Sequence, residues 1–293
     1  MKKIFYFALA AFTTMFVSCV DENKPSNGDE NGNSIVGTWN LQHDDDFETL
    51  DLTAGNNYNL YYSAFYKEDG SYTFENNTLT LTPSKAWTRD YIRDDVHGGP
   101  ILDENGNFQF TEWEETEPWF TTRSNQVTFL YSGDVMLVKT IDEHSGEPEE
   151  VWAPYVKDNA THVSNINDIQ GKWYWLMDVG EEFSVPRVIV NVNGNDGDVI
   201  ITPWGERYKG TVRYEKGVLY MDNPTFYTTR YEDGEGGWEH MNGADPENSD
   251  WRIPDGSGNY GQPAFGMISM GFVADGDVAY GGIANLLAKF VKQ

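Results

Sequence analysis

Apolar and polar residues alternate with a period of two through most of the chain beyond residue 35, and this alternation predicts short β-strands. Residues 188–192 (VIVNV) and 199–202 (VIIT) form one such pair, separated by the turn-forming residues 193–197 (NGNDG). A helical period is confined to residues 283–290, which suit either a short helix or a closing strand. The pattern therefore predicts an all-β chain built from antiparallel hairpins.

The strand pattern occurs twice. Residues 35–41 (IVGTWNL) recur as residues 169–175 (IQGKWYW), and residues 70–81 recur as residues 210–221. Further matches follow in the same order along both copies: Pro83 with Pro224, Thr88-Arg89 with Thr229-Arg230, and residues 132–135 with residues 275–278. Because the order is kept and the spacing between copies grows gradually, a tandem duplication explains the series better than chance. We therefore predict two β domains, residues 35–157 and residues 164–293.

Each copy is expected to close into a barrel, because open edges of an antiparallel sheet invite aggregation and closure removes them. A Gly-x-Trp sequence opens the first strand of each copy, as Gly37-Thr-Trp39 and Gly171-Lys-Trp173. This motif resembles the entry motif of lipocalins and of the lipocalin-like (calycin-like) domains of Bacteroidetes lipoproteins. The resemblance implies two tandem antiparallel eight-stranded β-barrels. A β-sandwich in each copy is the structural alternative.

The resemblance also gives the two tryptophans a structural role. In lipocalins this Trp packs across the closed end of the barrel, usually against a basic side chain of the last strand. Lys139 and Lys289 lie near the matching place, whereas the arginine usual in the family is missing from both copies. The glycines and tryptophans of the two motifs are thus expected to shape the barrel entry.

Residues 1–18 have the pattern of a secretory signal peptide. Two lysines precede an apolar run over residues 4–16, which is too short to span a hydrocarbon core of about 30 Å. The run leads into Val-Ser-Cys and resembles the lipobox of bacterial lipoproteins, with Phe16 in place of the usual Leu. The resemblance implies cleavage between Ser18 and Cys19 and acylation of Cys19. The alternative is a buried free cysteine at the end of an uncleaved helix.

The segment after the cleavage site, residues 19–34, is polar and acidic and predicts a flexible tether. Cys19 is the only cysteine, so no disulfide can form within the chain. Asp21 and Glu22 directly after it resemble the surface-export signal of Bacteroidetes lipoproteins. We therefore expect an outer-membrane protein held by its acyl chains and facing the cell surface. A periplasm-facing lipoprotein is the alternative.

The charge of the chain limits its partners. There are 47 acidic and 20 basic residues, giving a formal net charge of −27. Such a surface repels phosphate backbones, so nucleic acid is excluded. The expected partners are the membrane through the lipid anchor, a small-molecule or glycan ligand, and an envelope or transporter protein.

No catalytic signature is found, neither a Gly-x-Ser-x-Gly elbow nor a His-Glu-x-x-His motif nor a phosphate-binding loop. The five histidines are scattered singly, which predicts no metal site. Residues 191–198 suggest a calcium loop, but their glycine comes one place late for an EF-hand and no Glu follows at the twelfth position. A hairpin turn is favoured there. We expect a protein that is not an enzyme and has no cofactor.

Aromatic residues are unusually abundant, with 10 Trp, 17 Tyr and 16 Phe. Their rings suit stacking on sugars or lining an apolar pocket, although they also suit filling a small barrel. Several lie outside the strand patterns in loops, where binding residues concentrate. The candidate ligand-binding residues are Trp87, Arg89, Trp113, Trp119, Trp204, Arg230, Trp238 and Trp251.

These features favour a binding lipoprotein that captures a small apolar or aromatic ligand, or a glycan, without catalysis. The second hypothesis is a structural or protein-interaction module of the cell envelope. A glycan hydrolase is the least favoured, because with 47 acidic residues some carboxylate pair always lies at catalytic separation and carries no information.

Overall fold

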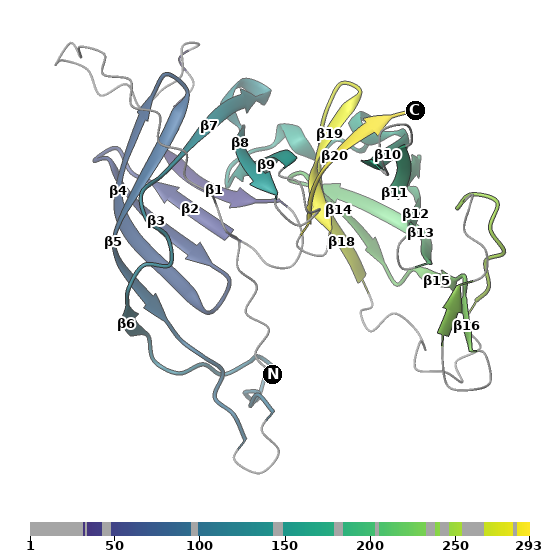
Figure 1. The fold of residues 1–293 in the computed structure, drawn as a ribbon, viewed down its shortest axis with the longest axis horizontal. Coiled ribbons are helices and arrows are strands. Elements are labelled where there is room, and N and C mark those ends of the chain that lie inside the picture. The colour runs from purple at the N-terminus through teal and green to yellow at the C-terminus, as the bar shows by residue number, and fades with distance from the viewer. Residues whose placement is uncertain are drawn as a thin grey trace. The chain divides into compact units, whose positions relative to one another are not determined.

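The structure is a computed structural model of the chain. It describes residues 32, 34–42, 48–94, 99–142, 149–178, 184–202, 205–232, 238–240, 246–253, 267–283 and 286–293. These residues are all-β apart from three short 3₁₀ turns, and they fall into two compact units with one barrel each (Figure 1). The predicted signal peptide, Cys19 and most of the predicted tether lie outside the described residues.

Barrel 1 is a closed ring of eight antiparallel strands. In ring order they are β1 (Gly37–Leu41), β2 (Glu48–Leu52), β3 (Asn57–Tyr62), β4 (Tyr66–Glu75), β5 (Thr78–Thr88), β7 (Arg123–Leu130), β8 (Val135–Asp142) and β9 (Glu149–Lys157). Each strand pairs with the next, and β9 returns to pair with β1. The short strand β6 (Glu114–Thr116) pairs with β5 outside the ring, and a 3₁₀ turn, η1 (Tyr131–Gly133), joins β7 to β8.

Barrel 2 repeats this up-and-down order. Its ring strands are β10 (Gly171–Asp178), β11 (Ser184–Asn193), β12 (Asp196–Ile201), β13 (Glu206–Glu215), β14 (Val218–Asp222), β18 (Met267–Asp275), β19 (Val278–Ile283) and β20 (Leu286–Lys292). Further short elements are β15 (Thr225–Thr228) on β13, the pair β16 (Arg230–Glu232) and β17 (Trp238–His240), and the 3₁₀ turns η2 (His162–Ser164) and η3 (Ile166–Ile169). The prediction of two antiparallel barrels rather than β-sandwiches is confirmed, and the arrangement fits a lipocalin-like fold.

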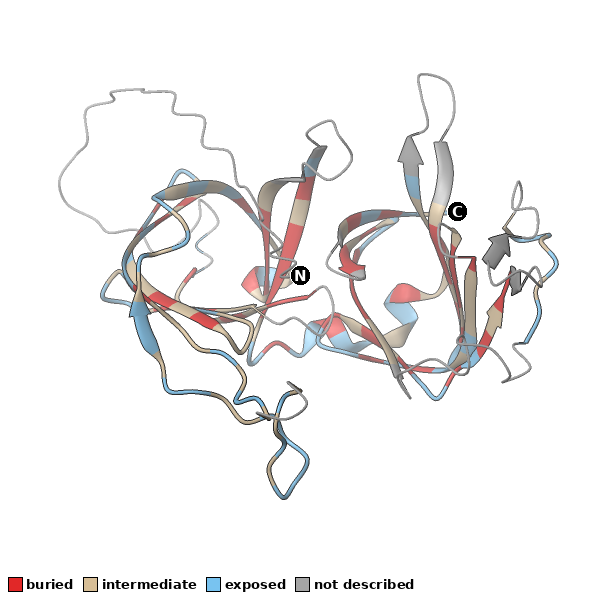
Figure 2. Cartoon of the chain, turned by 60° about the horizontal axis from the view of Figure 1, so that its bottom comes forward, coloured by how far each residue is buried: buried red, intermediate tan, exposed pale blue. Residues whose placement is uncertain are grey.

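Two local expectations are settled by strand pairing. Asn193 of β11 pairs with Asp196 of β12, which makes the suspected calcium loop a hairpin turn, as favoured. Residues 286–292 form the closing strand β20, which pairs with β10 and β19, so the strand alternative is correct for the C-terminal segment. Figure 2 shows how buried and exposed residues alternate along the strands of each ring.

The Gly-x-Trp tryptophans close one end of each barrel. Trp39 and Trp173 are fully buried, and their indole nitrogens donate to the carbonyl oxygens of Ile35 and Ile169 at 2.8 and 2.9 Å. Around Trp39 lie other rings of the same end, for example Phe129 with its centroid 6.1 Å away. The buried N–H is satisfied locally, so the large ring can fill the barrel end without an unpaired donor.

The basic residues over these rings are not the expected ones. Lys157 of β9 places its ammonium 4.8 Å from the Trp39 ring, and Lys292 of β20 lies 5.1 Å from Trp173. Each pairs directly with its tryptophan in the register of the last strand on the first. The prediction of Lys139 and Lys289 was wrong. Lys139 lies on β8, one strand before the last strand of barrel 1. Lys289 lies on the last strand of barrel 2 but is exposed, between the buried Ala288 and Phe290.

The glycines of the motifs are required by backbone and space together. Gly37 has φ +144° and Gly171 has φ +108°, a region that L side chains rarely adopt. A Cβ at Gly171 would lie 3.0 Å from Cε of Lys292, the side chain that covers Trp173. A side chain here would therefore strain the backbone and displace the covering lysine.

We expect Gly171→Ala to lower the free energy of unfolding of barrel 2 by about 2 kcal/mol through this strain. The matched control is Gly276→Ala in the same barrel, at φ +62° with no atom within 4 Å, which we expect to cost about 1 kcal/mol. Urea unfolding of the full chain measures both. Equal losses for the two variants would contradict a role for the Lys292 contact.

Candidate functional site

The two ends of barrel 1 differ in chemistry. Phe74, near the end of β4, packs on Phe129 and so belongs to the Trp39 end. Tyr66 starts the same strand eight residues earlier, about 26 Å away at about 3.3 Å per residue. We call the end marked by Tyr66 the distal end of barrel 1. It is also the end where β5 finishes, because Tyr66 pairs with Thr88.

A buried carboxylate lies inside the barrel below the distal end. Glu68 is 2% exposed and accepts three hydrogen bonds, from the hydroxyls of Tyr58 (2.8 Å) and Tyr66 (2.6 Å) and from the guanidinium of Arg123 (3.0 Å). The guanidinium and the two hydroxyls come from three different strands. A charge buried this deeply is tolerated only when paired and hydrogen-bonded, and both conditions are met here.

The tyrosines of this network stay protonated. Burial, together with the Glu68 carboxylate, raises the pKa of Tyr58 and of Tyr66 well above the ordinary tyrosine value. The same two causes, with Glu48 as the carboxylate, raise the pKa of Tyr155. These hydroxyls therefore remain donors to the carboxylates throughout the physiological range.

An aromatic row with one carboxylate forms the rim. Trp119 stacks on Tyr66 with centroids 3.9 Å apart, donates its backbone N–H to the Tyr66 hydroxyl (3.0 Å) and meets Tyr62 edge-on at 6.4 Å. Tyr62 pairs with Tyr66 on one side and with Glu48 on the other, and Glu48 accepts from the Tyr155 hydroxyl (2.7 Å). We call these five residues, Trp119, Tyr66, Tyr62, Glu48 and Tyr155, the distal row.

The distal row has an exposed end and a buried end. The Trp119 side lies towards solvent, since this residue is 54% exposed, whereas Tyr66 and Tyr155 are buried. Trp119 belongs to the segment between β5 and β7, residues 89–122, which we call the excursion. The excursion extends beyond the barrel where β5 finishes (Figure 1). An exposed aromatic ring above buried, hydrogen-bonded polar groups is an arrangement suited to binding a small ligand.

Barrel 2 lacks this chemistry at the equivalent positions. Strand registers match Glu48, Tyr62 and Tyr66 with Val188, Ile201 and Glu206. They also match Tyr58 with Gly197, Glu68 with Tyr208 and Arg123 with Ile268. One Tyr–Glu contact survives with its members exchanged, from the Tyr208 hydroxyl to Glu206 at 2.6 Å. The described interior of barrel 2 is otherwise a continuous apolar cluster around Trp173.

Three of the candidate residues predicted from sequence gather elsewhere, on the outer face of barrel 1. Lys67 places its ammonium 5.2 Å from the Trp87 ring and 4.6 Å from the Trp113 ring. Arg89 lies 4.4 Å from Trp113 and 4.2 Å from Phe110. Lys67 stands between the inward-facing Tyr66 and Glu68 in the strand, so this cluster points away from the interior.

Beyond that cluster the excursion forms a hairpin arm. Isolated bridges join Tyr91 to Phe110 and Leu102 to Phe108. The arm exposes apolar side chains, since Leu102 and Phe108 are each 50% exposed and Ile92 is 38% exposed. It is a second surface with potential for contact.

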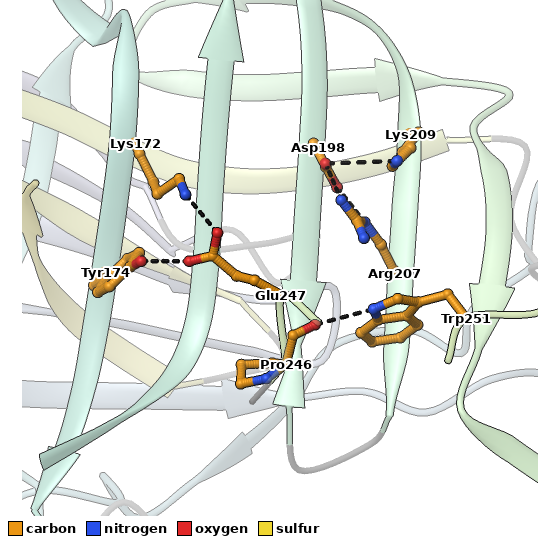
Figure 3. A network of polar contacts seen from close by, with 8 residues as sticks. All are labelled: Lys172, Tyr174, Asp198, Arg207, Lys209, Pro246, Glu247 and Trp251. Atoms are coloured by element: carbon orange, nitrogen blue, oxygen red, sulfur yellow. Dashed lines mark hydrogen bonds and ion pairs between the residues drawn. The ribbon is translucent and has the colours of Figure 1, made fainter. Parts of the chain in front are cut away.

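Trp251 lies against the outer wall of barrel 2. Its indole nitrogen donates to the Pro246 carbonyl oxygen at 3.0 Å, and the Arg207 guanidinium is 5.7 Å from its ring (Figure 3). Arg207 in turn binds Asp198 through two hydrogen bonds. The ring is thus packed into a network that holds residues 246–253 on the wall.

The same segment is fixed at a second point. Glu247 accepts hydrogen bonds from Lys172 and from the Tyr174 hydroxyl, both on the outer face of β10 (Figure 3). At the other side Arg252 bridges to Thr228 of β15. Trp204 and the side chains of Arg230 and Trp238 lie outside the described residues.

The structure therefore brings Trp87, Arg89 and Trp113 together on the outer face of barrel 1. It places Trp119 in the distal row of the same barrel and Trp251 on the wall of barrel 2. The sequence analysis missed Tyr62, Tyr66, Glu68, Arg123, Glu48 and Tyr155. One signal was available for Glu68, because it shares the strand face of Phe74 and Tyr72, where a charged residue is out of place. The abundance of acidic residues hid it.

No protein-family model, curated protein or solved structure shows a significant match to the chain. In the part of the chain that the structure describes, no three His, Cys, Asp or Glu side chains gather as a metal site. The described residues also include no helix that has the length and apolarity to cross a bilayer.

We expect the tyrosine network to make the protein sensitive to alkali. Tyr58, Tyr66 and Tyr155 have folded pKa values above the unfolded value of about 10, so their stabilisation is complete below pH 10 and is lost as the pH rises further. Absorbance at 295 nm should show a late tyrosinate phase that coincides with unfolding. Tyr66→Phe should make the fall of unfolding free energy above pH 10 less steep. Ionisation of all 17 tyrosines near pH 10 with the fold intact would contradict this.

Proposed function

We propose that this protein is a non-catalytic, ligand-binding lipoprotein whose binding site is the distal end of barrel 1. The observation that carries the proposal is the exposed Trp119 ring stacked on Tyr66 directly above the buried Glu68 network. The ring offers a flat face for an aromatic or sugar ring, and the distal row offers oriented polar groups beside it. Barrel 2 has an apolar interior and lacks these polar groups at the matching positions.

Trp119 suits binding rather than filling of the barrel interior. A ring that only filled the barrel would be buried, as Trp39 is, whereas Trp119 is 54% exposed. The Glu68–Arg123 pair fixes Tyr66 by hydrogen bonds, so the platform under a ligand is rigid before binding. Rigid platforms lose little conformational entropy on binding.

The location of this function is part of the proposal. The lipobox-like residues ahead of Cys19 support acylation and retention in the outer membrane, and the acidic residues after it support exposure at the cell surface over a periplasm-facing orientation. This is the setting of the Bacteroidetes-type lipoproteins that the sequence resembles. A surface position would bring extracellular ligands directly to barrel 1.

The interaction module remains the second candidate because of one observation. The arm of barrel 1 exposes Ile92, Leu102 and Phe108, apolar side chains on a protein whose formal net charge is −27. Exposed apolar groups of this kind suit contact with another envelope or transporter protein. Binding of a ligand by barrel 1 and contact through the arm are compatible.

We expect Trp119→Ala to weaken binding of ring-containing ligands about tenfold, because one aromatic stacking contact contributes about 1.5 kcal/mol. Tryptophan fluorescence and native mass spectrometry of the full chain in detergent, against glycan, bile-acid, haem, cobalamin and lipid panels, identify the ligand. Trp251→Ala is the matched control, since that ring lies on the wall of barrel 2, and it should leave affinity unchanged. If no compound in the panels binds the parent protein, the proposal fails.

We expect Cys19→Ala to abolish acylation and to release the protein from the membrane fraction, because no other cysteine can accept a lipid. Incorporation of a palmitate analogue and detergent phase partitioning measure the loss. Val20→Ala serves as the control and should remain acylated. Protease treatment of intact cells then distinguishes the surface from the periplasmic orientation, and an unlabelled parent protein would refute anchoring.

A further inference from the structure

We infer that the distal row of barrel 1 binds an organic ammonium ion, with the charge held between the aromatic rings and Glu48. The inference rests on the proposed function and names the ligand class of the same site. It follows from three features of the described residues: an uncompensated carboxylate, a set of aromatic faces beside it, and a tryptophan without a cation of its own.

The charges at the distal end do not cancel. Glu68 is neutralised by Arg123, its ion-pair partner at 3.0 Å. Glu48 accepts only from the neutral Tyr155 hydroxyl among the described residues. Because Glu48 is half-buried, water compensates its charge less fully than at the surface. A positive group entering the rim would therefore gain from this carboxylate without first breaking an ion pair.

Aromatic faces lie next to that carboxylate. Tyr62 pairs with Glu48 across β2 and β3, and Tyr66 and Trp119 follow in the same row. A cation over such rings is attracted to their faces, and the attraction is stronger where the site is desolvated. Recognition of quaternary ammonium groups uses aromatic rings in this way, and a carboxylate beside the rings adds Coulomb attraction for the same charge. A neutral sugar would use the rings but would leave Glu48 uncompensated.

Cation–π contacts of the same kind occur between side chains of the chain itself. Lys157 lies over Trp39, Lys292 over Trp173 and Arg187 over Trp175 at 4.6 Å. Trp87, Trp113 and Trp251 are likewise covered by Lys67, Arg89 or Arg207. Trp119 has its ring on Tyr66, and no Lys or Arg of the described residues lies over it. Its exposed face is therefore open to a cation from outside the chain.

The inference also fixes the stoichiometry at one site per chain. The positions in barrel 2 that match Glu48 and Tyr62 are Val188 and Ile201, both buried in the apolar cluster. They offer neither charge nor a ring. The formal net charge of −27 further favours the approach of cations to the protein as a whole.

The test uses choline and its uncharged carbon isostere, 3,3-dimethylbutan-1-ol, on the full chain in detergent by calorimetry and tryptophan fluorescence. We expect choline to bind one site at least tenfold more tightly than the isostere, and the difference to shrink as salt is raised. Glu48→Gln should remove most of the choline preference while leaving isostere binding unchanged. Glu206→Gln in barrel 2, where the glutamate also accepts from a tyrosine, is the matched control and should change neither.

A second variant guards against a folding defect. Trp119→Leu should weaken choline and isostere together, and thermal unfolding shows whether either variant has lost the fold. Benzyl alcohol serves as an uncharged probe that carries an aromatic ring. If choline binds no more tightly than the isostere while benzyl alcohol quenches the fluorescence of Trp119, the ligand class is wrong and the proposed site stands. If none of these probes and no panel compound binds, the inference and the proposed function both fail.

Discussion

Closure of each ring by its first and last strands is the constraint on which the rest of the structure depends. In each barrel the buried tryptophan lies where the first and last strands pair. Its indole N–H donates to the carbonyl oxygen of the preceding isoleucine, and a lysine of the last strand lies over its ring. Closure pairs all edges of the ring and leaves the distal end to vary. The two barrels accordingly agree closely around Trp39 and Trp173 and differ at the opposite end.

The two barrels differ at the distal end because their interiors bury different side chains. Barrel 2 keeps an apolar cluster around Trp173, which stabilises by burial alone. Barrel 1 places Glu68 and Arg123 inside, and a buried pair of this kind contributes little net stability once desolvation is counted. Its hydrogen-bonded tyrosines hold a defined geometry instead, and that geometry is what supports Trp119.

The sequence predicted what depends on local pattern. The alternation of apolar and polar residues predicted the strands, and the internal repeat predicted the two barrels. The Gly-x-Trp motifs predicted the closed ends. It could not identify Lys157 and Lys292, because that requires the register of the last strand on the first. Likewise Arg123 meets Glu68 only because β7 pairs with β5 after a long excursion. The sequence also could not tell that Trp87 and Trp113 face outward while Trp119 turns to the rim.

Tyr66 and Glu68 of barrel 1 are matched by Glu206 and Tyr208 in barrel 2, so the two residue types are exchanged. In both copies the hydroxyl donates to the carboxylate two residues away at 2.6 Å, so the pair is satisfied in either order. Only the order in barrel 1 puts the carboxylate deep, within reach of Arg123, and leaves a ring at the rim on which Trp119 can stack. Because both orders satisfy the hydrogen bond, this contact alone does not determine whether the ring or the carboxylate lies at the rim.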